Sequence, residues 1–439
     1  MDQSTLRVFK FGGASIRDAE AIRNVAHILQ GQQGASLLVV VSAMGKTTNA
    51  LEGVVDAYHN GNIALANERL GVIRDQHLLT VKDLFGDIPS ELVDQLNDLL
   101  VSVEWVLDDD PNPDRDYDYD QIVPLGELMS SRIVAAYLNQ QALKTNWVDA
   151  RDIIITDNIF REGQVQWQST QERARKLITP LLEEEGFVLT QGFIGSTTEN
   201  FTTTLGREGS DYTAAIFSHC LDAESMSIWK DVPGVLTADP RIFDNVAKLD
   251  RLSYKEAIEM TYYGAKVIHP KTIKPLQNKN IPLYVRSFID PNGTGTLING
   301  EMEEQYPAMV AIERKQALLH ISTRDFSFVA EHHIKALFEK ITELRLQVNM
   351  MQNTAISFNV VFNDTDDKVD HFVELIQDDF KTILDRDLEL ITVRHFTKDV
   401  IERLRMGKLV LLEERLPKTI QMVVKDVPVL RRKGEGTVK

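Results

Sequence analysis

The chain has 439 residues, which at about 150 residues per domain suggests two or three domains. Hydrophobic residues make up 43% and charged residues 26%, a composition typical of globular proteins that excludes disordered and collagen-like chains. The formal net charge of −17 argues against a broad basic surface, so we expect no nucleic-acid partner. A single cysteine, Cys220, excludes an intramolecular disulfide and a multi-cysteine metal site.

The first residues, MDQSTLRVFKF, do not combine a basic region with a following apolar stretch, so they do not resemble a secretory signal. No apolar run reaches the roughly 18 residues that a membrane span needs. We therefore expect a cytoplasmic protein with no membrane partner.

Short β-rich runs alternate with helical patterns through the first two thirds of the chain. A strand is expected at 7–11, a helix at 18–29, and a strand of continuous apolar residues at 37–42, a pattern typical of strands buried on both faces. Further strands are expected at 147–149, 187–190, 226–229 and 282–285. This alternation predicts an α/β fold with a mostly parallel sheet covered by helices.

The composition shifts near residues 290–307, where Gly, Pro, Asn and acidic residues indicate a connector between domains at 1–300 and 308–439. The elements expected beyond it are strand 317–323, helix 331–344, strand 346–351, strand 355–362, helix 368–381, strand 388–395, helix 398–405, strand 409–414 and strand 419–424. This order predicts a small α+β module repeated once, with the second copy truncated.

Two polar, glycine-containing turns follow the first two expected strands. KFGGAS, residues 10–15, offers Lys10 and a glycine turn whose N–H groups can face an anion at a helix start. VSAMGKTTN, residues 41–49, offers Ser42 and Thr48, but Val40 stands where a P-loop needs glycine, so a P-loop is excluded. Ligands in open α/β sheets bind at such carboxyl ends of strands.

Three later motifs repeat this strand-then-loop pattern. In TTTLGREGSDYTA the cation Arg207 precedes a helix start at Ser210 and Asp211, where Asp211 is suited either to cap the helix or to hold a magnesium ion. KDVPGVLTADPR begins at Lys230, and YGAKVIHPKT contains Lys266. Each of these motifs is weak when taken alone.

Together and in this order, the motifs resemble those of aspartate kinases, which belong to the amino-acid kinase superfamily. SAMGKTTN, the GE of PLGELMSSR, TQGFIG, TTTLGREGSDYTA, KDVPGVLTADPR and YGAKVIHPKT all match, and KFGGAS is similar to the family's KFGGTS. The resemblance extends from Lys10 to about residue 290, and more loosely through the tail. It implies an amino-acid kinase fold followed by regulatory ACT modules, which are βαββαβ units.

The resemblance also implies an activity: ATP-dependent phosphorylation of the β-carboxylate of L-aspartate to 4-phospho-L-aspartate, the first step toward lysine, threonine and methionine. ATP and Mg²⁺ would be the cofactors. The acceptor is a carboxylate that is already ionised at neutral pH, so no general base is required. Catalysis would consist of positioning two anions and neutralising charge on the transferring phosphoryl group.

Roles for individual residues follow from the matched motifs. Lys10 would contact the terminal phosphates and the attacking carboxylate, Arg207 would pair with a substrate carboxylate, and Glu127 would bind the α-ammonium group. Ser42 and Thr48 would supply hydroxyl groups to aspartate. Lys10, Arg207 and Asp211 would form the catalytic set.

The remaining matched positions concern the nucleotide and the metal. Gly12, Gly13 and Ser15 would cradle phosphate. Ser210 and Asp211 would lie beside the phosphates, with Asp211 as the Mg²⁺ ligand. The other nucleotide-binding positions would be Lys230, Asp231, Arg241, Lys266 and Val267.

Two positions depart from the family's pattern. Glu208 replaces a glycine beside the phosphates, where a carboxylate would repel ATP unless it points outward or pairs. Glu208→Gly is therefore expected to keep activity or to improve ATP binding. Leu236 stands where many members have tyrosine, which removes one contact to the nucleotide.

Two alternative functions remain: another amino-acid kinase that uses glutamate, N-acetylglutamate or UMP, and a catalytically dead ACT sensor. The GE at Gly126 and Glu127 with the ACT-like tail argues against the first, and the charged residues Lys10, Arg207 and Asp211 argue against the second. The length of the chain also argues against a fused homoserine dehydrogenase.

The tail suggests a homodimer, formed by edge-to-edge pairing of exposed ACT strands. Lysine-sensing relatives hold their effector with a glycine turn before the first ACT helix and an acidic residue after its second strand. Here His332 or a neighbour falls at that turn, and Asn349 falls at the acidic position. We therefore expect weak or absent inhibition by lysine, with threonine or no effector as alternatives.

Overall fold

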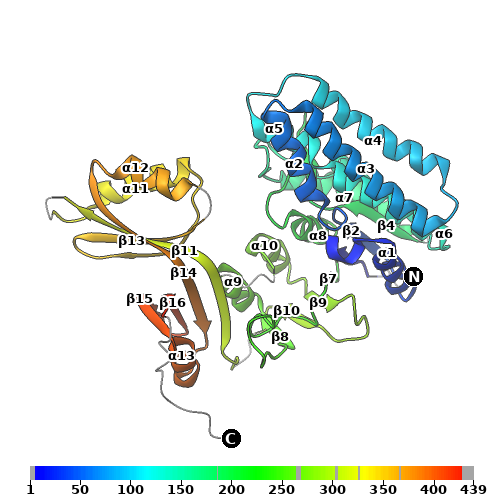
Figure 1. The fold of residues 1–439 in the computed structure, drawn as a ribbon. Coiled ribbons are helices and arrows are strands. Elements are labelled where there is room, and N and C mark those ends of the chain that lie inside the picture. Colours follow the sequence, from blue (N-terminus) through cyan, green and yellow to red (C-terminus); the bar gives the residue numbers. More distant parts are fainter. Residues whose placement is uncertain are drawn as a thin grey trace, which may run out of the picture. The chain divides into compact units, whose positions relative to one another are not determined.

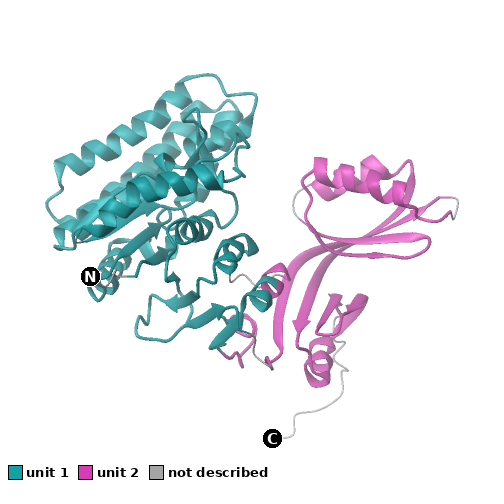
Figure 2. Ribbon diagram, turned by 180° about the vertical axis from the view of Figure 1, so that it is seen from behind, with its two compact units in different colours: residues 1–235, 248–258, 267–303 teal, residues 236–247, 259–266, 304–439 magenta. Residues whose placement is uncertain are grey.

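The computed structural model describes residues 5–184, 186–263, 268–301, 305–324, 327–364 and 367–427. The chain divides into two compact units (Figure 1; Figure 2). The first unit comprises residues 1–235, 248–258 and 267–303, and the second comprises residues 236–247, 259–266 and 304–439. None of the helices in the described part of the chain combines the length and hydropathy that crossing a membrane requires.

An eight-stranded sheet forms the centre of the first unit. Its order is β3-β4-β2-β1-β7-β9-β10-β8, and every neighbouring pair is parallel except β9 with β10. The strands are β1 (Arg7–Phe11), β2 (Leu37–Val41), β3 (Thr145–Trp147), β4 (Phe187–Gln191), β7 (Ser225–Lys230), β8 (Arg251–Ser253), β9 (Leu283–Ser287) and β10 (Thr296–Asn299). A separate two-stranded ribbon pairs β5 (Ile194–Ser196) with β6 (Thr202–Thr204).

Helices cover both faces of this sheet. They are α1 (Ala19–Gln30), α2 (Thr47–His59), α3 (Ile63–Phe85), α4 (Ser90–Asp108), α5 (Arg115–Ile122), α6 (Leu125–Gln140), α7 (Trp167–Glu183), α8 (Gly209–Cys220), α9 (Tyr254–Tyr262) and α10 (Pro270–Asn278), with short 3₁₀ turns η1 (Gly13–Ile16) and η2 (Ala150–Asp152). Helix α9 crosses from the first unit into the second. This arrangement confirms the α/β fold class expected from the sequence.

The side chains of β1 alternate between the two faces of the eight-stranded sheet. Phe9 and Phe11 join the large core formed with helices α1 to α6. Successive side chains of a strand point to opposite faces, so Lys10 points toward the other face. Helix α8 packs against β1, β2 and β7, and its first turn meets Lys10 there.

A six-stranded antiparallel sheet forms the second unit, in the order β12-β13-β11-β14-β16-β15. Its elements are β11 (Met309–Thr323), α11 (Glu331–Glu343), β12 (Val348–Asn353), β13 (Ser357–Asn363), α12 (Lys368–Ile376), β14 (Phe380–Arg394), α13 (Lys398–Arg405), β15 (Lys408–Arg415) and β16 (Thr419–Asp426).

The two longest strands each serve both halves of this sheet. Residues 316–323 of β11 and 380–385 of β14 combine with β12 and β13, with α11 and α12 as the helices of that half. Residues 389–394 of β14 combine with β15, β16 and residues 309–313 of β11. The fourth strand of the second half is therefore the beginning of β11, which comes before the first half in the sequence. The described helix of the second half is α13.

Strand lengths in the tail differ from those expected. The sequence pattern predicted a helix at 368–381, but α12 ends at Ile376 and β14 begins at Phe380. Phe380 is buried in the core beneath α11 and α12, and pairing with β11 across Thr323 makes the segment extended. Tertiary pairing overrides the local helical pattern here, as it often does in strands.

Candidate active site

A buried ion pair lies where β1 meets the start of α8. Lys10 Nζ lies 2.6 Å from Asp211 Oδ1, and the two residues are 8% and 3% exposed. Lys230, the last residue of β7, places its Nζ 3.7 Å from Asp211 Oδ2. Because β1 and β7 are adjacent parallel strands, their lysines reach the same carboxylate although 220 positions separate them.

The two lysines determine the ionisation of Asp211. Burial alone would raise the pKa of this carboxyl, but the positive charges and hydrogen bonds of Lys10 and Lys230 outweigh burial and lower the pKa. Asp211 is therefore an anion that holds two ammonium groups at the start of a helix. That cluster can receive phosphate oxygens without first having to bring the cations together.

The glycine turn after β1 is tightly packed against the turn after β2. A Cβ on Gly13 would lie 2.9 Å from the carbonyl oxygens of Ala43 and Gly45, so a side chain here would force the turns apart. A Cβ on Gly12 would lie 3.3 Å from Lys10 Nζ. Ser15 is buried, and its Oγ donates to the carbonyl of Trp229 at 3.3 Å. These glycines let backbone approach the lysine closely.

A second buried carboxyl, that of Glu127, lies in the first turn of α6. Its Oε1 accepts a hydrogen bond from Ala43 N–H at 3.2 Å, while Oε2 is buried without a hydrogen-bond partner in the described part of the chain. Burial raises the pKa of Glu127 to about 8, although Lys10 acts to lower it. A buried carboxyl oxygen without a partner is suited to receive a cationic group such as an ammonium.

The hydroxyl residues expected to contact the substrate belong to the turn after β2 and to the start of α2. Ser42 is half-buried directly after β2, and its carbonyl accepts from Ser130 Oγ of α6 at 2.6 Å. Thr48 is half-buried in the first turn of α2, whereas Thr47 is buried and donates to the Met44 carbonyl. Thr48 is thus the more accessible hydroxyl of the pair.

The turn before α8 carries Arg207 and Glu208, and Ser210 lies in the first turn of the helix. Arg207 is exposed, and within the described residues its side chain makes no ion pair or hydrogen bond. Ser210 is buried, and the carboxylate of Glu208 accepts a hydrogen bond from His269 N–H at 2.8 Å. The glutamate is thus paired, one of the two arrangements expected to limit its repulsion of ATP.

The other expected nucleotide residues are less closely gathered. Asp231 is exposed just after β7. Arg241 is exposed, belongs to the second unit and forms a bidentate pair with Asp239. Lys266 and Val267 lie outside the described residues.

One close approach was not anticipated from the sequence. A Cβ on Gly192, just after β4, would lie 2.4 Å from the Cβ of Ser210, so the β4 turn and the start of α8 are in direct contact. The available signal was the glycine of the matched TQGFIG motif.

A family model described as the amino acid kinase family matches residues 5–287. The chain belongs to the amino acid kinase family. Lysine-sensitive aspartokinase 3 of Escherichia coli strain K12 is 31% identical over 369 residues, covering 82% of this chain and 79% of that protein. Chloroplastic aspartokinase 1 of Arabidopsis thaliana is 31% identical, covering 84% of this chain and 67% of that protein.

Solved aspartokinase structures share this fold. E. coli aspartokinase III in complex with aspartate and ADP matches with a TM-score of 0.82 and 27% identity, covering 95% of this chain and 96% of that one. The same enzyme in complex with lysine and aspartate matches with a TM-score of 0.80 at 27% identity, covering 95% of both chains. Within its family, the chain groups with the aspartokinases, as the sequence motifs predicted.

Few protein ligands for a metal are available at this amino acid kinase site. In the described part of the chain, no group of three or more His, Cys, Asp and Glu residues is arranged to hold an ion. Asp211 is a single buried carboxylate, and Mg²⁺ commonly takes one or two carboxylates together with substrate phosphates and waters. The donor set fits a Mg²⁺ ion that arrives with a nucleotide.

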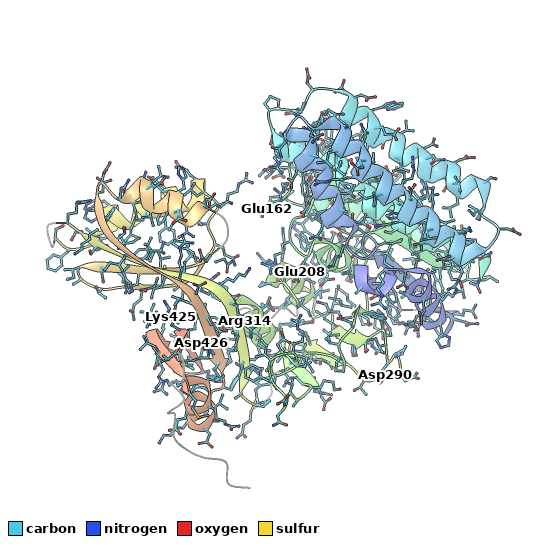
Figure 3. The ribbon with its side chains drawn as sticks, viewed as in Figure 1. Glu162, Glu208, Asp290, Arg314, Lys425 and Asp426 are labelled. Carbon is cyan, nitrogen blue, oxygen red and sulfur yellow. The ribbon has the colours of Figure 1, made fainter. Side chains whose placement is uncertain are left out.

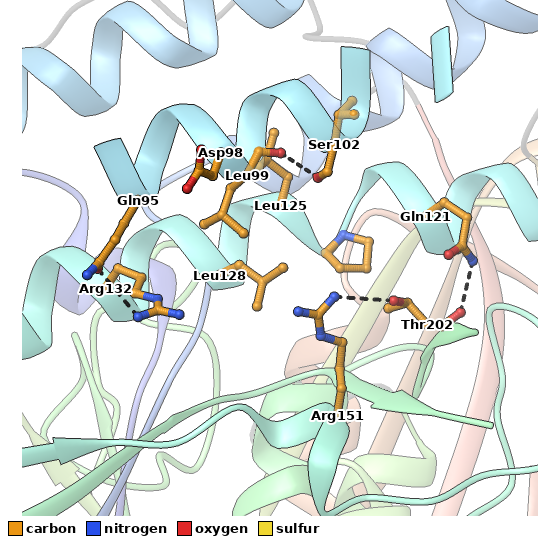
Figure 4. Close-up of a pocket in the computed structure, with 12 residues that line it drawn as sticks. Gln95, Asp98, Leu99, Ser102, Gln121, Leu125, Leu128, Arg132, Arg151 and Thr202 are labelled. Carbon is orange, nitrogen blue, oxygen red and sulfur yellow. Dashed lines mark hydrogen bonds between the residues drawn. The ribbon is translucent and has the colours of Figure 1, made fainter. Parts of the chain in front are cut away.

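A separate cavity of about 290 Å³ opens between α4, α6 and η2, and Figure 4 shows its lining. None of the expected site residues lines it. Its two guanidinium groups are already engaged: Arg151 pairs with Asp149 and contacts Thr202, and Arg132 stacks on Trp147. The cavity also exposes the Asp98 carboxylate and contains none of the residues expected to bind a nucleotide or aspartate.

Proposed function

We propose that this chain catalyses ATP-dependent phosphorylation of the β-carboxylate of L-aspartate, giving 4-phospho-L-aspartate and ADP. The observation that carries the proposal is the buried Lys10–Asp211 pair, joined by the half-buried Lys230, together with the Glu127 carboxyl, whose Oε2 has no hydrogen-bond partner among the described residues. This arrangement combines cations for phosphate with an anion for an ammonium group. The aspartate and ADP bound by E. coli aspartokinase III support the same assignment.

The chemical step needs charge neutralisation more than proton transfer. An ionised carboxylate oxygen attacks the γ-phosphorus of ATP, the bond to the ADP oxygen breaks, and ADP leaves with the electron pair. Lys10 and Lys230 offset the repulsion between these two anions and stabilise the charge on the transferring group. Asp211 holds both ammonium groups in place.

Aspartate recognition divides between groups of opposite charge. Glu127 receives the α-ammonium, and Arg207 pairs with a substrate carboxylate, for which its planar fork is suited. The half-buried Ser42 and Thr48 supply hydroxyl groups. Arg207 has no competing partner within the described residues, which leaves its guanidinium available to substrate.

Nucleotide binding uses the glycine turn and the start of α8. Gly12, Gly13, Ser15 and Ser210 surround the phosphates, and Asp211 contributes a Mg²⁺ ligand when the metal enters with ATP. The metal supplies further neutralisation of the phosphate charge. The remaining nucleotide contacts are assigned from the matched motifs to Lys230, Asp231, Arg241, Lys266 and Val267.

We further propose a catalytic domain at residues 1–300 and two ACT-like modules at 308–439. Lysine bound to E. coli aspartokinase III supports an amino-acid effector, for which lysine and threonine are the candidates here. A homodimer formed by the ACT-like modules and a cytoplasmic location remain predictions.

The direct test incubates the purified chain with ATP, Mg²⁺ and L-aspartate and traps the acyl phosphate with hydroxylamine. Aspartyl hydroxamate should accumulate with stoichiometric ADP. Parallel assays offer glutamate, N-acetylglutamate and UMP as acceptors. Phosphorylation of one of these in place of aspartate would assign a different amino-acid kinase activity, and no turnover with any acceptor would favour a sensor.

A further inference from the structure

Glu208 has a backbone conformation that glutamate rarely adopts. Its φ of 54° and ψ of 28° lie in the left-handed region, at the residue that caps the N-terminus of α8. Glycine reaches this region without steric cost, and the aspartate kinase motif has glycine at this position. A glutamate in this conformation carries a steric cost that glycine avoids.

The carboxylate of Glu208 makes a hydrogen bond with the start of another helix. Oε2 accepts the backbone N–H of His269 at 2.8 Å, and His269 is the N-cap of the nine-residue helix α10. The next residue is Pro270, which has no N–H, so His269 offers the donor at this end. A carboxylate at a helix N-terminus is also favoured by the helix dipole.

A second bond runs in the opposite direction between the same two segments. Lys271, in the first turn of α10, donates from Nζ to the carbonyl of Leu205 at 3.0 Å. Residues 205–208 are thus attached to α10 at both ends of the turn. Figure 3 labels Glu208 and the exposed Glu162, which borders the same turn at Gly206.

We propose that Glu208 is a positioning residue that couples aspartate binding to nucleotide binding. The inference rests on the proposed function. Arg207, which precedes Glu208, is assigned to aspartate, while His269 belongs to the YGAKVIHPKT motif assigned to the nucleotide. Arg207 is exposed and has no partner of its own within the described residues, so its direction depends on the backbone of the turn. The Glu208–His269 bond restrains that backbone at the next residue.

Three substitutions separate the effect of the Glu208–His269 hydrogen bond, here called the tether, from the effect of the left-handed backbone at Glu208. Glu208→Gly removes the carboxylate and relieves the left-handed conformation, Glu208→Ala removes the carboxylate and keeps the strain, and Glu208→Gln keeps an acceptor oxygen. Glu162→Ala is the control for the loss of a carboxylate beside the turn: Glu162 acts electrostatically on Lys271 but does not accept the His269 N–H. Thermal unfolding of all four variants checks that each one folds.

Initial rates measured over a grid of aspartate and ATP concentrations give the coupling between the two substrates. We expect Glu208→Gly and Glu208→Ala to raise KM for aspartate about fivefold or more and to weaken its dependence on ATP, with a smaller change in kcat. This replaces the expectation from the sequence that Glu208→Gly keeps activity or improves ATP binding, because the Glu208 carboxylate bonds His269 N–H. Glu208→Gln and Glu162→Ala should stay close to the wild type. A purely structural role would lower the unfolding temperature of Glu208→Ala and leave both KM values unchanged in Glu208→Gly.

Amide hydrogen exchange at His269 measures how well the bond to Glu208 protects this N–H, and it needs no assay of activity. Exchange should accelerate in Glu208→Gly and Glu208→Ala, and stay protected in Glu208→Gln and Glu162→Ala. Unchanged exchange in Glu208→Gly would overturn the tether, and faster exchange with wild-type KM values would overturn the coupling. If the wild type is inactive but its His269 amide is protected, the proposed function is rejected and the Glu208–His269 bond is not. The ADP affinity of the variants then tests whether that bond affects nucleotide binding.

Discussion

The two large sheets bury polar groups in different ways. At the carboxyl ends of parallel strands, the first unit buries charged side chains: Lys10, Asp211 and Glu127 are all less than one tenth exposed. At the β11 bulge of the second unit, the buried polar group is neutral, with Asn349 Nδ2 donating to Gln316 Oε1 at 2.7 Å and to Asn363 Oδ1 at 2.8 Å. The same sheet also buries Arg394, but that charge is paired with Glu259 at 2.8 Å.

The difference matters because burying an ionisable group costs more free energy than burying a neutral amide that is hydrogen-bonded. A neutral amide cluster is satisfied by its own members, so it stabilises the sheet and needs no ligand. A buried carboxyl such as that of Glu127, with a raised pKa and an oxygen that has no partner among the described residues, is destabilising until something binds it. The first sheet is therefore the one arranged for chemistry, and the predictions below test that division.

Removing Lys10 should have the largest effect. Lys10→Ala removes a cation whose contact strengthens as charge develops on the phosphoryl group, which costs about 3 kcal/mol or more of transition-state stabilisation. Steady-state kinetics should show kcat lowered by about 100-fold or more, with a much smaller change in KM for aspartate. Lys279→Ala, which removes a half-buried ammonium bonded to the His219 carbonyl, is the control and should retain its kcat. Near-normal turnover in Lys10→Ala would remove this residue from the catalytic set.

Removing the residues that contact aspartate should affect binding. Arg207→Ala and Glu127→Ala each leave one charge of bound aspartate without a partner, and an unpaired buried charge costs about 2–5 kcal/mol. KM for aspartate should rise strongly in both variants, while ADP affinity measured by calorimetry stays close to that of the wild type. A loss of nucleotide affinity with no change in KM for aspartate would show that the two subsites are reversed.

The pH profile should report the ionisation of Glu127. Burial raises the pKa of this carboxyl to about 8, so it is mainly protonated at neutral pH and becomes an anion as the pH rises through 8. The α-ammonium of aspartate needs the anion, so kcat/KM for aspartate should rise between about pH 7 and 9. In Glu127→Gln, the rise of kcat/KM with pH should be absent and kcat/KM for aspartate should be lower. A wild-type profile that is flat over this range would contradict the buried, protonated carboxyl.

The smallest effect is expected from lysine. Asn349 has no charge to offer an effector ammonium, and its amide already donates to Gln316 and Asn363. Initial rates at subsaturating aspartate should show weak or absent inhibition by millimolar L-lysine, with L-threonine tested in parallel. Strong cooperative inhibition by lysine alone would show that this half of the sheet holds a charged site elsewhere.

Much of the first unit could be predicted from local patterns. The strands expected at 37–42 and 187–190 agree closely with β2 and β4, because apolar runs are typical of buried parallel strands. In the tail, β11 and β14 each have 15 residues, about twice the lengths expected. Their extra residues pair with a second half-sheet, and local sequence does not reveal such a distant partner.

The candidate active site also has one part that the sequence predicted and another that it did not. The motifs identified Lys10, Arg207, Asp211 and Glu127 as residue types suited to phosphate and an amino acid. No pattern indicated that Asp211 lies between Lys10 and Lys230, because that depends on β1 and β7 being neighbours in the sheet. The sequence showed that Glu208 departs from the family's glycine, but not that its carboxylate reaches His269.

By itself, the sequence determined the family, the α/β class, and the charged and glycine residues that the chemistry uses. These follow from short-range patterns, where residue type and spacing act within one strand, turn or helix. The tertiary structure alone decided which charges meet, how deeply they are buried and what that burial does to the pKa of Glu127 and Asp211. Electrostatic energy depends on distance and on exclusion of water, and both arise only when segments far apart in the chain pack together.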